Sequence, residues 1–366
     1  MGLKCGIVGL PNVGKSTLFN CLSNARAATA NFPFCTIEPN VGVVQVPDPR
    51  LNLLANLVHP ERVVPATVEI VDIAGLVKGA SKGEGLGNQF LSNIRECQAI
   101  IHVLRCFENP NIVHVEGCVD PIRDKELIDT ELQLKDLETI EKRISRIEKQ
   151  ARTGTDKDAA REYETLKLVK THLDKGLNVR ALHLKPEDQE IVDALHLLTR
   201  KAVLYLCNVD ESSAKFGNVY SKKVEEMAAN EGASSLTLAV ATEEAIAQLE
   251  TNEEIQLFLQ ELGLDEPGVN RLIRKAYELL KLHTFFTAGP KEVRAWTISQ
   301  GAKAPEAAGV IHSDFQKGFI RAEVIRFDDY IRLGSEAACR EEGKLSIEGK
   351  EYIVRDGDII HFRFNV

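Results

Sequence analysis

The segment 9–17 has the pattern GxxxxGK(S/T), which is typical of a loop that binds nucleoside triphosphates. Gly9 and Gly14 allow the backbone to curl, so that N–H groups and the N-terminus of the next helix face the α and β phosphates. Lys15 brings an ammonium group to the β and γ oxygens, and Ser16 offers a hydroxyl ligand to Mg²⁺. We expect nucleotide contacts from Asn12, Val13, Gly14, Lys15, Ser16 and Thr17, with Lys15 also catalytic.

A second motif, DxxG, ends the apolar run 68–73. Asp72 is placed to hold a water on Mg²⁺, and Gly75 lets its backbone N–H approach the γ-phosphate. Thr36, between the two motifs, is either a second hydroxyl ligand or an ordinary threonine at a strand edge. The sequence therefore predicts a Mg²⁺ site made by Ser16, Thr36 and Asp72.

The base-recognition motif differs from that of a GTPase. A guanine site usually carries Asn-Lys-x-Asp after a strand, whereas this chain has Asn208, Val209 and Glu211 at the corresponding positions. Guanine therefore loses both the lysine that covers it and the short carboxylate that anchors it. Adenine can be satisfied by backbone groups near Val209 and by the side chain of Asn208. The residues favour ATP but leave GTP open, since Glu211 can reach guanine after small shifts.

The group that orients the attacking water is not in its usual place. Many GTPases have a glutamine directly after DxxG, and this chain has Leu76, which cannot orient a water. His114 is our catalytic candidate, because its loop follows the strand 100–104 and strand C-termini meet at the nucleotide crevice. The alternative is a solvent-exposed loop histidine. Phe107 either stacks on the adenine or belongs to the core.

Composition limits the class of protein. The 366 residues are 44% hydrophobic and 27% charged, typical of a globular protein, and the net charge of −9 argues against a chain that coats nucleic acid. The eight cysteines are scattered without a C-x-x-C pair, which favours reduced thiols. No secretion signal or transmembrane run is recognisable. We expect a cytoplasmic monomer without DNA or membrane partners.

Short apolar runs at 68–73, 99–104 and 202–207, separated by helical stretches, predict an α/β domain with a mostly parallel sheet. The pattern changes between 128 and 198. An apolar seam at spacings of 3 and 4 predicts an antiparallel helical hairpin; its members are Leu137, Ile140, Ile144, Ile147 and Ala151.

From about residue 281 the pattern changes again, to short alternating strands separated by turns. Strands are expected at 293–298, 319–325, 352–354 and 359–364. The pattern predicts that this part of the chain forms a small domain built on a β-sheet.

The motifs together resemble the Obg-like ATPase family, known as YchF in bacteria. The resemblance covers essentially the whole chain, and its long motifs are at 9–17, 31–40, 72–77, 83–88 and 361–366. It implies a P-loop NTPase that hydrolyses ATP rather than GTP and has a helical insert and a C-terminal TGS domain of β-grasp fold. It also implies association with the ribosome or its large subunit. The expected domains are 1–127 with 199–280 for the nucleotide, 128–198 for the insert and 281–366 for TGS.

The sequence thus predicts a Mg²⁺-dependent ATPase that converts ATP to ADP and phosphate and acts as a nucleotide-dependent switch in translation or stress response. A GTPase switch, or a ribosome or RNA adaptor with incidental turnover, remains the alternative. Ribosome contacts are expected from two basic clusters, although such charges are often only a solvated face. The clusters are Lys142, Arg143, Arg146, Lys149 and Arg152 in the insert, and Lys317, Arg321, Arg326 and Arg332 near the C-terminus.

Overall fold

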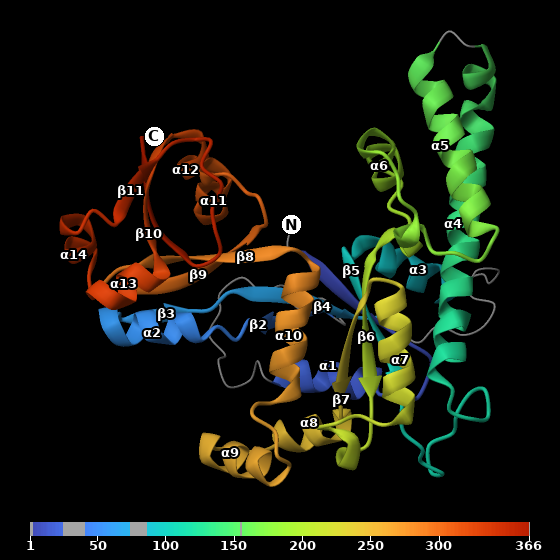
Figure 1. The fold of residues 1–366 in the computed structure, drawn as a ribbon, viewed down its shortest axis with the longest axis horizontal. Coiled ribbons are helices and arrows are strands. Elements are labelled where there is room, and N and C mark those ends of the chain that lie inside the picture. Colours follow the sequence, from blue (N-terminus) through green and yellow to red (C-terminus); the bar gives the residue numbers. More distant parts are fainter. Residues whose placement is uncertain (1–2, 25–40, 74–85, 154–155, 366) are drawn as a thin grey trace. The chain divides into compact units, whose positions relative to one another are not determined.

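The structure is a computed structural model, and it describes residues 3–24, 41–73, 86–153 and 156–365 (Figure 1). The chain divides into two compact units, residues 1–42 with 69–269 and residues 43–68 with 270–366. The predicted ligands Thr36 and Gly75, together with Leu76, lie outside the described residues. Within the described ranges, no helix is both long and apolar enough to cross a membrane.

The strands β1, β5, β6 and β7 lie wholly in the first unit and belong to a six-stranded sheet of order β2-β4-β1-β5-β6-β7. Strand β1 pairs in parallel with β4 and β5, and β6 pairs in parallel with β5 and β7. All seven residues of β5 are buried, as expected for a central strand covered on both faces. The predicted α/β fold class is confirmed. The strands are β1 Lys4–Val8, β2 Val41–Gln45, β4 Thr67–Asp72, β5 Ala99–Arg105, β6 Ala202–Asn208 and β7 Ser234–Leu238.

Helical segments connect the parallel strands, as crossovers between parallel neighbours require. Those from the start of the chain to the hairpin are α1 Lys15–Asn24, α3 Leu86–Glu96, α4 Pro121–Thr153 and α5 Lys157–Leu173. Those that follow are α6 Pro186–Asp193, α7 Val219–Asn230, α8 Val240–Ile246 and α9 Asn252–Glu261, and α10 Gly268–Leu279 belongs mostly to the second unit.

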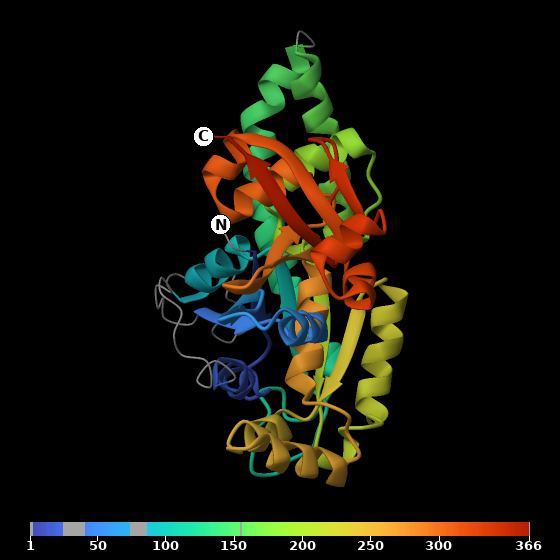
Figure 2. The same cartoon turned by 90° about the vertical axis from the view of Figure 1, so that its left-hand side faces the viewer.

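Helices α4 and α5 form the predicted hairpin and run side by side in both views (green in Figures 1 and 2). Ile140 and Ile147 of the seam are buried against Leu166 and Val169 of α5. Asp156 begins α5 by accepting hydrogen bonds from the Asp158 and Ala159 amides. Helix α4 starts at Pro121, well before the hairpin, so one continuous helix joins the nucleotide sheet to the tip of the insert.

The second unit has a six-stranded sheet of order β11-β10-β12-β8-β9-β3. β8 and β9 form an antiparallel hairpin, β12 runs parallel to β8, and α11 packs its alanines against Phe285 and Val324 in the core. The strands are β3 Arg62–Val64, β8 Leu282–Ala288, β9 Glu292–Ser299, β10 Phe319–Arg326, β11 Leu345–Glu348 and β12 Asp358–Phe364. The helices are α2 Pro49–Val58, α11 Ala304–Ile311, α12 Ser313–Lys317, α13 Phe327–Leu333 and α14 Glu336–Glu341.

One predicted strand of the C-terminal part needs correction, and the predicted domain bounds stay a prediction. The segment 352–354 is not a strand, because only Ile353 makes a single bridge, to Lys303. Residues 43–68 also belong to this compact unit, with β3 pairing in parallel with β9. Arg50 of α2 explains part of this association, since it bonds Asp356 at 2.6 Å.

Replacing Leu166, a fully buried hairpin residue, with alanine should destabilise the hairpin by about 2–5 kcal/mol through the cavity it leaves. Hydrogen exchange of the amides in α4 and α5 measures this as faster exchange. Leu168→Ala is the matched control, because Leu168 is 51% exposed on the same helix and should change stability by less than about 0.5 kcal/mol. Equal exchange in the two variants would contradict the assigned core.

Candidate functional site

The phosphate-binding segment connects β1 to α1 in the geometry that the motif predicts. Gly9, Asn12 and Gly14 have positive φ angles of 159°, 63° and 100°. A Cβ at Gly14 would lie 2.5 Å from Asn208 Nδ2, so the loop can pack there only as glycine. Lys15 begins α1, and its Nζ donates to the Leu10 carbonyl at 2.8 Å.

Lys15 is buried, and this burial lowers its pKa to about 8, while the negative charge of Asp72 opposes the shift. A buried ammonium with one carbonyl partner is strongly attractive to an anion, because a phosphate oxygen would supply the missing countercharge. The segment can therefore hold a phosphate chain.

A cavity of about 460 Å³ opens beside this segment, a volume within the usual range for small-molecule sites. It lies at the C-terminal ends of β1, β5, β6 and β7, where ligands bind in open α/β sheets. The lining residues are Asn12, Gly14, Lys15, Ser16, Thr17, Phe107, Ile112, Asn208, Val240, Ala241 and Glu244.

Asp72 and Ser16 suit a divalent cation. Asp72 ends β4 beside β1, in register with Ile7. Its Oδ1 is buried and has no hydrogen-bond partner within the described ranges. Burial raises the pKa of Asp72, while Lys15 and a hydrogen bond from the Ser16 hydroxyl lower it. An unpaired carboxylate oxygen next to a hydroxyl fits Mg²⁺, which prefers oxygen ligands. Metal binding here remains a prediction.

Asn208, at the end of β6, connects the phosphate-binding segment to the start of α8. Its Nδ2 donates to the Val13 carbonyl at 2.9 Å, and its Oδ1 accepts from the Val240 amide at 3.0 Å. The side chain is buried and lines the cavity. Sequence reasoning gave Asn208 only a role toward the base, whereas here it also fixes the shape of the site.

The other two residues of the predicted base motif, Val209 and Glu211, are not among the described residues that line the cavity. Val209 is buried, and its amide bonds the Leu238 carbonyl at 3.0 Å. Glu211 is exposed and begins a short 3-10 turn, which Asp210 caps by accepting from the Ser213 amide. The base contacts of Val209 and Glu211 stay a prediction.

Arg105, at the end of β5, shapes the wall of the cavity and was not identified from the sequence. Its buried guanidinium donates to the carbonyls of Phe107, Asn109 and Ile112 at 3.1, 3.2 and 3.0 Å. It also lies 4.7 Å from the centre of the Phe107 ring. Burial lowers the pKa of Arg105, and Asp124 opposes this. Phe107 is thus held at the cavity rather than in the core.

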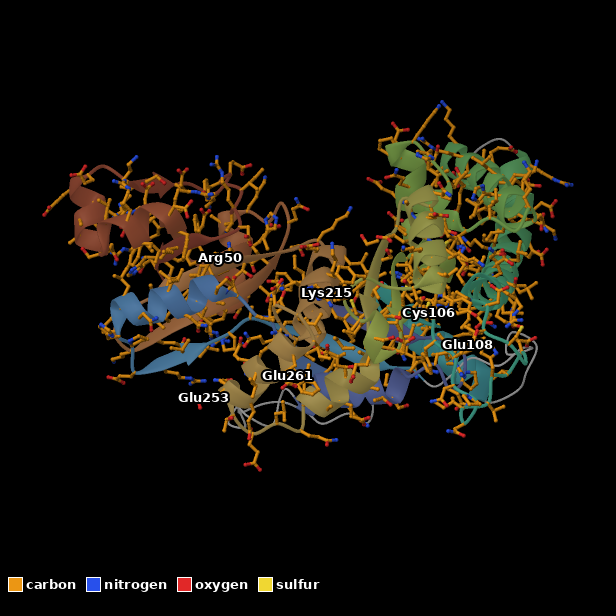
Figure 3. All side chains as sticks on the ribbon, turned by 60° about the horizontal axis from the view of Figure 1, so that its bottom comes forward. Arg50, Cys106, Glu108, Lys215, Glu253 and Glu261 are labelled. Carbon is orange, nitrogen blue, oxygen red and sulfur yellow. The ribbon has the colours of Figure 1, made fainter. Side chains whose placement is uncertain are left out.

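A second set of contacts ties this loop to the start of α7. Asn218 donates to the Cys106 carbonyl at 2.6 Å, and the Tyr220 hydroxyl donates to Glu108 at 2.5 Å. Figure 3 labels Cys106 and Glu108 on the loop. The same Asn218 caps α7, so loop and helix are fixed together.

His114 is not the solvent-exposed loop histidine that the sequence allowed. Its side chain is only 7% exposed, and Nε2 lies 2.9 Å from Asp124 Oδ2. Its Nδ1 accepts from the Glu116 amide at 3.1 Å. The cavity-lining residues described above do not include His114, although its neighbour Val113 accepts a hydrogen bond from Asn12. Its catalytic role stays a prediction.

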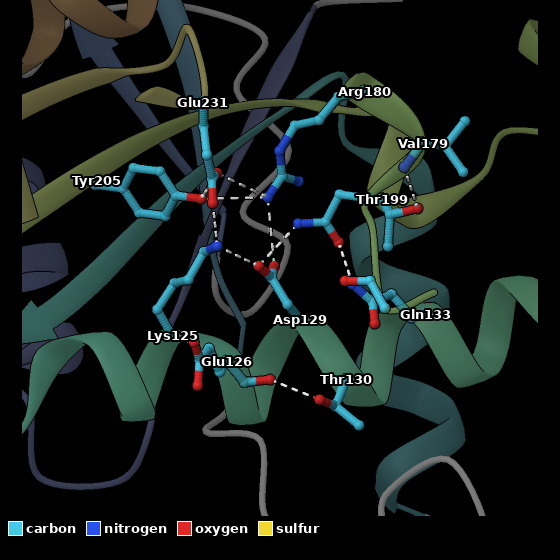
Figure 4. Close-up of polar contacts among 12 residues, drawn as sticks. Lys125, Glu126, Asp129, Thr130, Gln133, Val179, Arg180, Thr199, Tyr205 and Glu231 are labelled. Atoms are coloured by element: carbon cyan, nitrogen blue, oxygen red, sulfur yellow. Dashed lines mark hydrogen bonds and ion pairs between the residues drawn. The ribbon is translucent and has the colours of Figure 1, made fainter. Parts of the chain in front are cut away.

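A buried polar network fixes the first turns of α4 to the sheet (Figure 4). Asp129 is 2.9 Å from Lys125 and 3.4 Å from Arg180, and Lys125 also pairs with Glu231. The Tyr205 hydroxyl of β6 donates to Glu231 at 2.8 Å. The network therefore joins α4 to β6 and to the end of α7.

Comparison with known proteins covers the whole chain. Relatives named "Ribosome-binding ATPase YchF" are 56% identical in Haemophilus ducreyi, 57% in Escherichia coli O157:H7 and 54% in Bacillus subtilis, each over 100% of both chains. Residues 282–365 match the YchF-GTPase_C family, described as a protein of unknown function, and residues 4–150 match MMR_HSR1, described as a 50S ribosome-binding GTPase.

Among solved structures, the YchF GTPase of Schizosaccharomyces pombe has a TM-score of 0.90 at 39% identity. The alignment covers 99% of this chain and 98% of that one.

Lys15→Ala should weaken ATP binding at least about 100-fold, because Lys15 supplies the one ammonium among the described residues that line the cavity. Calorimetric titration with Mg²⁺ present measures this. The ligand-free melting temperature should stay near that of the parent, and Lys4→Ala, which removes a lysine paired with Glu69, should bind normally. Unchanged affinity in Lys15→Ala would contradict the phosphate site.

Arg105→Lys should lower ATP affinity about tenfold, since lysine keeps the charge but cannot reach the same carbonyls with a planar fork. Arg200→Lys, at an arginine of the same unit whose side chain is 24% exposed, should bind ATP as the parent does. Parent-like affinity in Arg105→Lys would show that the loop is held by other contacts.

Proposed function

The chain belongs to the YchF family, and we propose that it is a Mg²⁺-dependent ATPase that acts as a cytoplasmic monomer and associates with the ribosome. As a P-loop protein of this family it is a nucleotide hydrolase. The observation that carries the proposal is the cavity at Lys15 and Ser16, with the unpaired Asp72 oxygen nearby. Lys15 would bind the triphosphate there, and Ser16 and Asp72 would bind the cation.

The proposed preference for ATP rests on the base end of the cavity. In a GTPase the acid of the base motif binds the N1–H and 2-amino edge of guanine, and here that acid, Glu211, is not among the described lining residues; the carboxylate that does line the cavity, Glu244, belongs to α8 and not to the motif. The walls there come from Phe107, Val240 and the Asn208 amide. Asn208 Nδ2 retains a second N–H beyond the one given to Val13, which can donate to an adenine nitrogen.

For hydrolysis, we assign binding and transition-state charge stabilisation to Lys15 and the backbone N–H groups of its loop. Mg²⁺, held by Ser16 and Asp72, would supply positive charge to the phosphate oxygens when bound. His114 is the proposed group that orients the water. Its ring must first leave Asp124, since both ring nitrogens are engaged.

ATP should bind at least about tenfold more tightly than GTP, a difference of about 1.4 kcal/mol. The reason is that Val209 and Glu211 replace the lysine and the aspartate that bind guanine in a GTPase. Parallel calorimetric titrations with the two nucleotides and Mg²⁺ measure this directly. Equal affinities, or tighter GTP binding, would favour the GTPase alternative.

Ribosome association is proposed from the names of the relatives and from the exposed charges of the hairpin. The predicted basic cluster is largely paired: Arg143 bonds Glu162 at 2.5 Å, and Arg152 bonds Glu148 at 2.6 Å. Lys142 pairs with Glu138. Such cations are less available to RNA phosphates.

Within the part of the chain that the structure describes, Arg146 and Lys149 are exposed and have no acidic partner. They are therefore our candidates for phosphate contacts on the hairpin. In the C-terminal cluster, Arg321, Arg326 and Arg332 also pair with acids, whereas exposed Lys317 has no acidic partner among the described residues.

Reversing the charge of both Arg146 and Lys149 to glutamate should weaken ribosome co-sedimentation at low salt and flatten its salt dependence by about two counterions. ATP turnover without ribosomes should not change. The matched control is Lys222→Glu with Lys223→Glu, the same charge change on exposed positions of α7. Equal loss in both pairs would mean that net charge, and not the hairpin, governs binding.

A further inference from the structure

The sheet of the second unit contains an open strand edge. Strand β12 runs parallel to β8, but among the described residues only Ile359 and Phe286 pair in register between the two strands. Strand β8 ends soon afterwards, at Ala288, whereas β12 continues to Phe364 and stays paired with β10 on its other side. In the part of the chain that the structure describes, the edge of β12 beyond Ile359 that faces away from β10 therefore has no neighbouring strand.

A cavity of about 540 Å³ lies along this edge, a volume within the usual range for ligand sites. The turn between β8 and β9 encloses it with Ala288, Gly289 and Pro290. Along a strand, alternate residues direct their N–H and C=O groups to opposite sides, so part of the backbone of 360–364 points away from β10. Such an edge is a template for pairing with another extended chain.

One wall of this cavity is aromatic, formed by Trp296, Phe315 and Phe364. Phe364 stacks on Phe315 of α12 with ring centres 3.8 Å apart, yet 38% of Phe364 stays exposed. The ring of Trp296 is held by a hydrogen bond of 2.9 Å from Nε1 to Thr287 Oγ1 and by the Arg294 guanidinium, 3.8 Å from the ring centre. An apolar side chain that entered the cavity would therefore be buried against a fixed aromatic surface.

The opposite face of β12 is cationic. Because side chains alternate along a strand, Arg363 lies on the face opposite to Phe364. On that face the carboxylate of Glu323, only 4% exposed, is shared by three arginines at 3.3, 3.6 and 3.1 Å: Arg321, Arg340 and Arg363. Glu336 also pairs with Arg340, and cations still exceed carboxylates. Lys291, at the rim of the cavity, is exposed and has no acidic partner among the described residues, so this face attracts carboxylates.

We propose that the second unit binds an extended peptide segment of a partner protein, which adds to the open edge of β12. The backbone of the segment would pair with β12, as in other domains that recognise peptides by strand addition. Its side chains would alternate, with apolar ones against the aromatic wall and acidic ones against the cationic face, because a strand presents successive side chains to opposite faces. The site lies wholly within the second unit and does not depend on the proposed ATPase activity.

Trp296 is the single tryptophan of the chain and lines the cavity, so its fluorescence reports directly on occupancy. The probe is a synthetic peptide of about eight residues that alternates valine and glutamate; at about 3.3 Å per residue it is long enough to span the edge of 360–364. Titrated into the full-length protein, it should change the Trp296 emission to saturation. Two control peptides should bind at least about tenfold more weakly. One has its valines and glutamates in separate blocks, and the other is N-methylated along its backbone and cannot donate to β12.

Two variants test the protein side of the contact. Ala288→Phe should fill the cavity and weaken binding of the alternating peptide at least about tenfold, without adding a tryptophan. Its control is Ala337→Phe, the same change at an exposed position of α14 outside the lining residues. Lys291→Glu should weaken binding about threefold, and exposed Lys350→Glu should not. If Ala288→Phe fails to fold, Lys291→Glu still decides, because its side chain lies at the surface.

An unchanged Trp296 emission at peptide concentrations up to about 1 mM would overturn the proposal. Equal binding of the N-methylated peptide would show that the cavity takes an apolar molecule rather than a strand. Equal binding of the block peptide would show that the two faces do not read alternating side chains, and either result counts against the proposal. So does an equal loss in a variant and its control. An emission that changes with protein concentration alone would mean that a second copy of this chain fills the cavity instead.

Discussion

The arrangement of the first unit depends on the buried ion cluster around Asp129. Burial alone would raise the pKa of Asp129, but Arg180 and Lys125 outweigh it and hold this pKa below its usual range. Removing one partner from such a cluster costs about 3–5 kcal/mol, because a charge is left buried and unpaired. The cluster thus fixes α4 where it leaves the sheet. His102 of β5 lies beneath it beside Tyr205, and burial lowers its pKa to about 4, which keeps it neutral at physiological pH.

Local pattern was enough to predict the features that depend on local geometry. The phosphate segment needs Gly9 and Gly14 for its positive φ angles, and those residues stand in the sequence at fixed spacing. The hairpin follows from apolar side chains at helical period, and Ile140 and Ile147 are buried as the period requires. Strands β9, β10 and β12 were predicted from the alternating pattern of short strand-like segments separated by turns.

Features made by contacts between distant segments could not be predicted. Arg105 and Asp129 are charged residues, and a charged residue has the same sequence pattern whether it is solvated or buried with partners. Arg143 looked like part of a free basic face, although Glu162 binds it from the other helix. The pairing of β3 with β9 joins residues far apart in the chain, and the spacing of apolar residues within a segment cannot predict which distant strand it pairs with.

Two kinds of interaction hold the base of α4, and they respond differently to motion. The pairs of Lys125 and Arg180 with Asp129 are largely electrostatic, and Coulomb energy falls only as the inverse of distance. The contact between His114 and Asp124 is a single hydrogen bond, which weakens steeply once its angle falls below about 120°. The ionic cluster is therefore less sensitive to a small change in the position of α4 than the directional contact between His114 and Asp124 is.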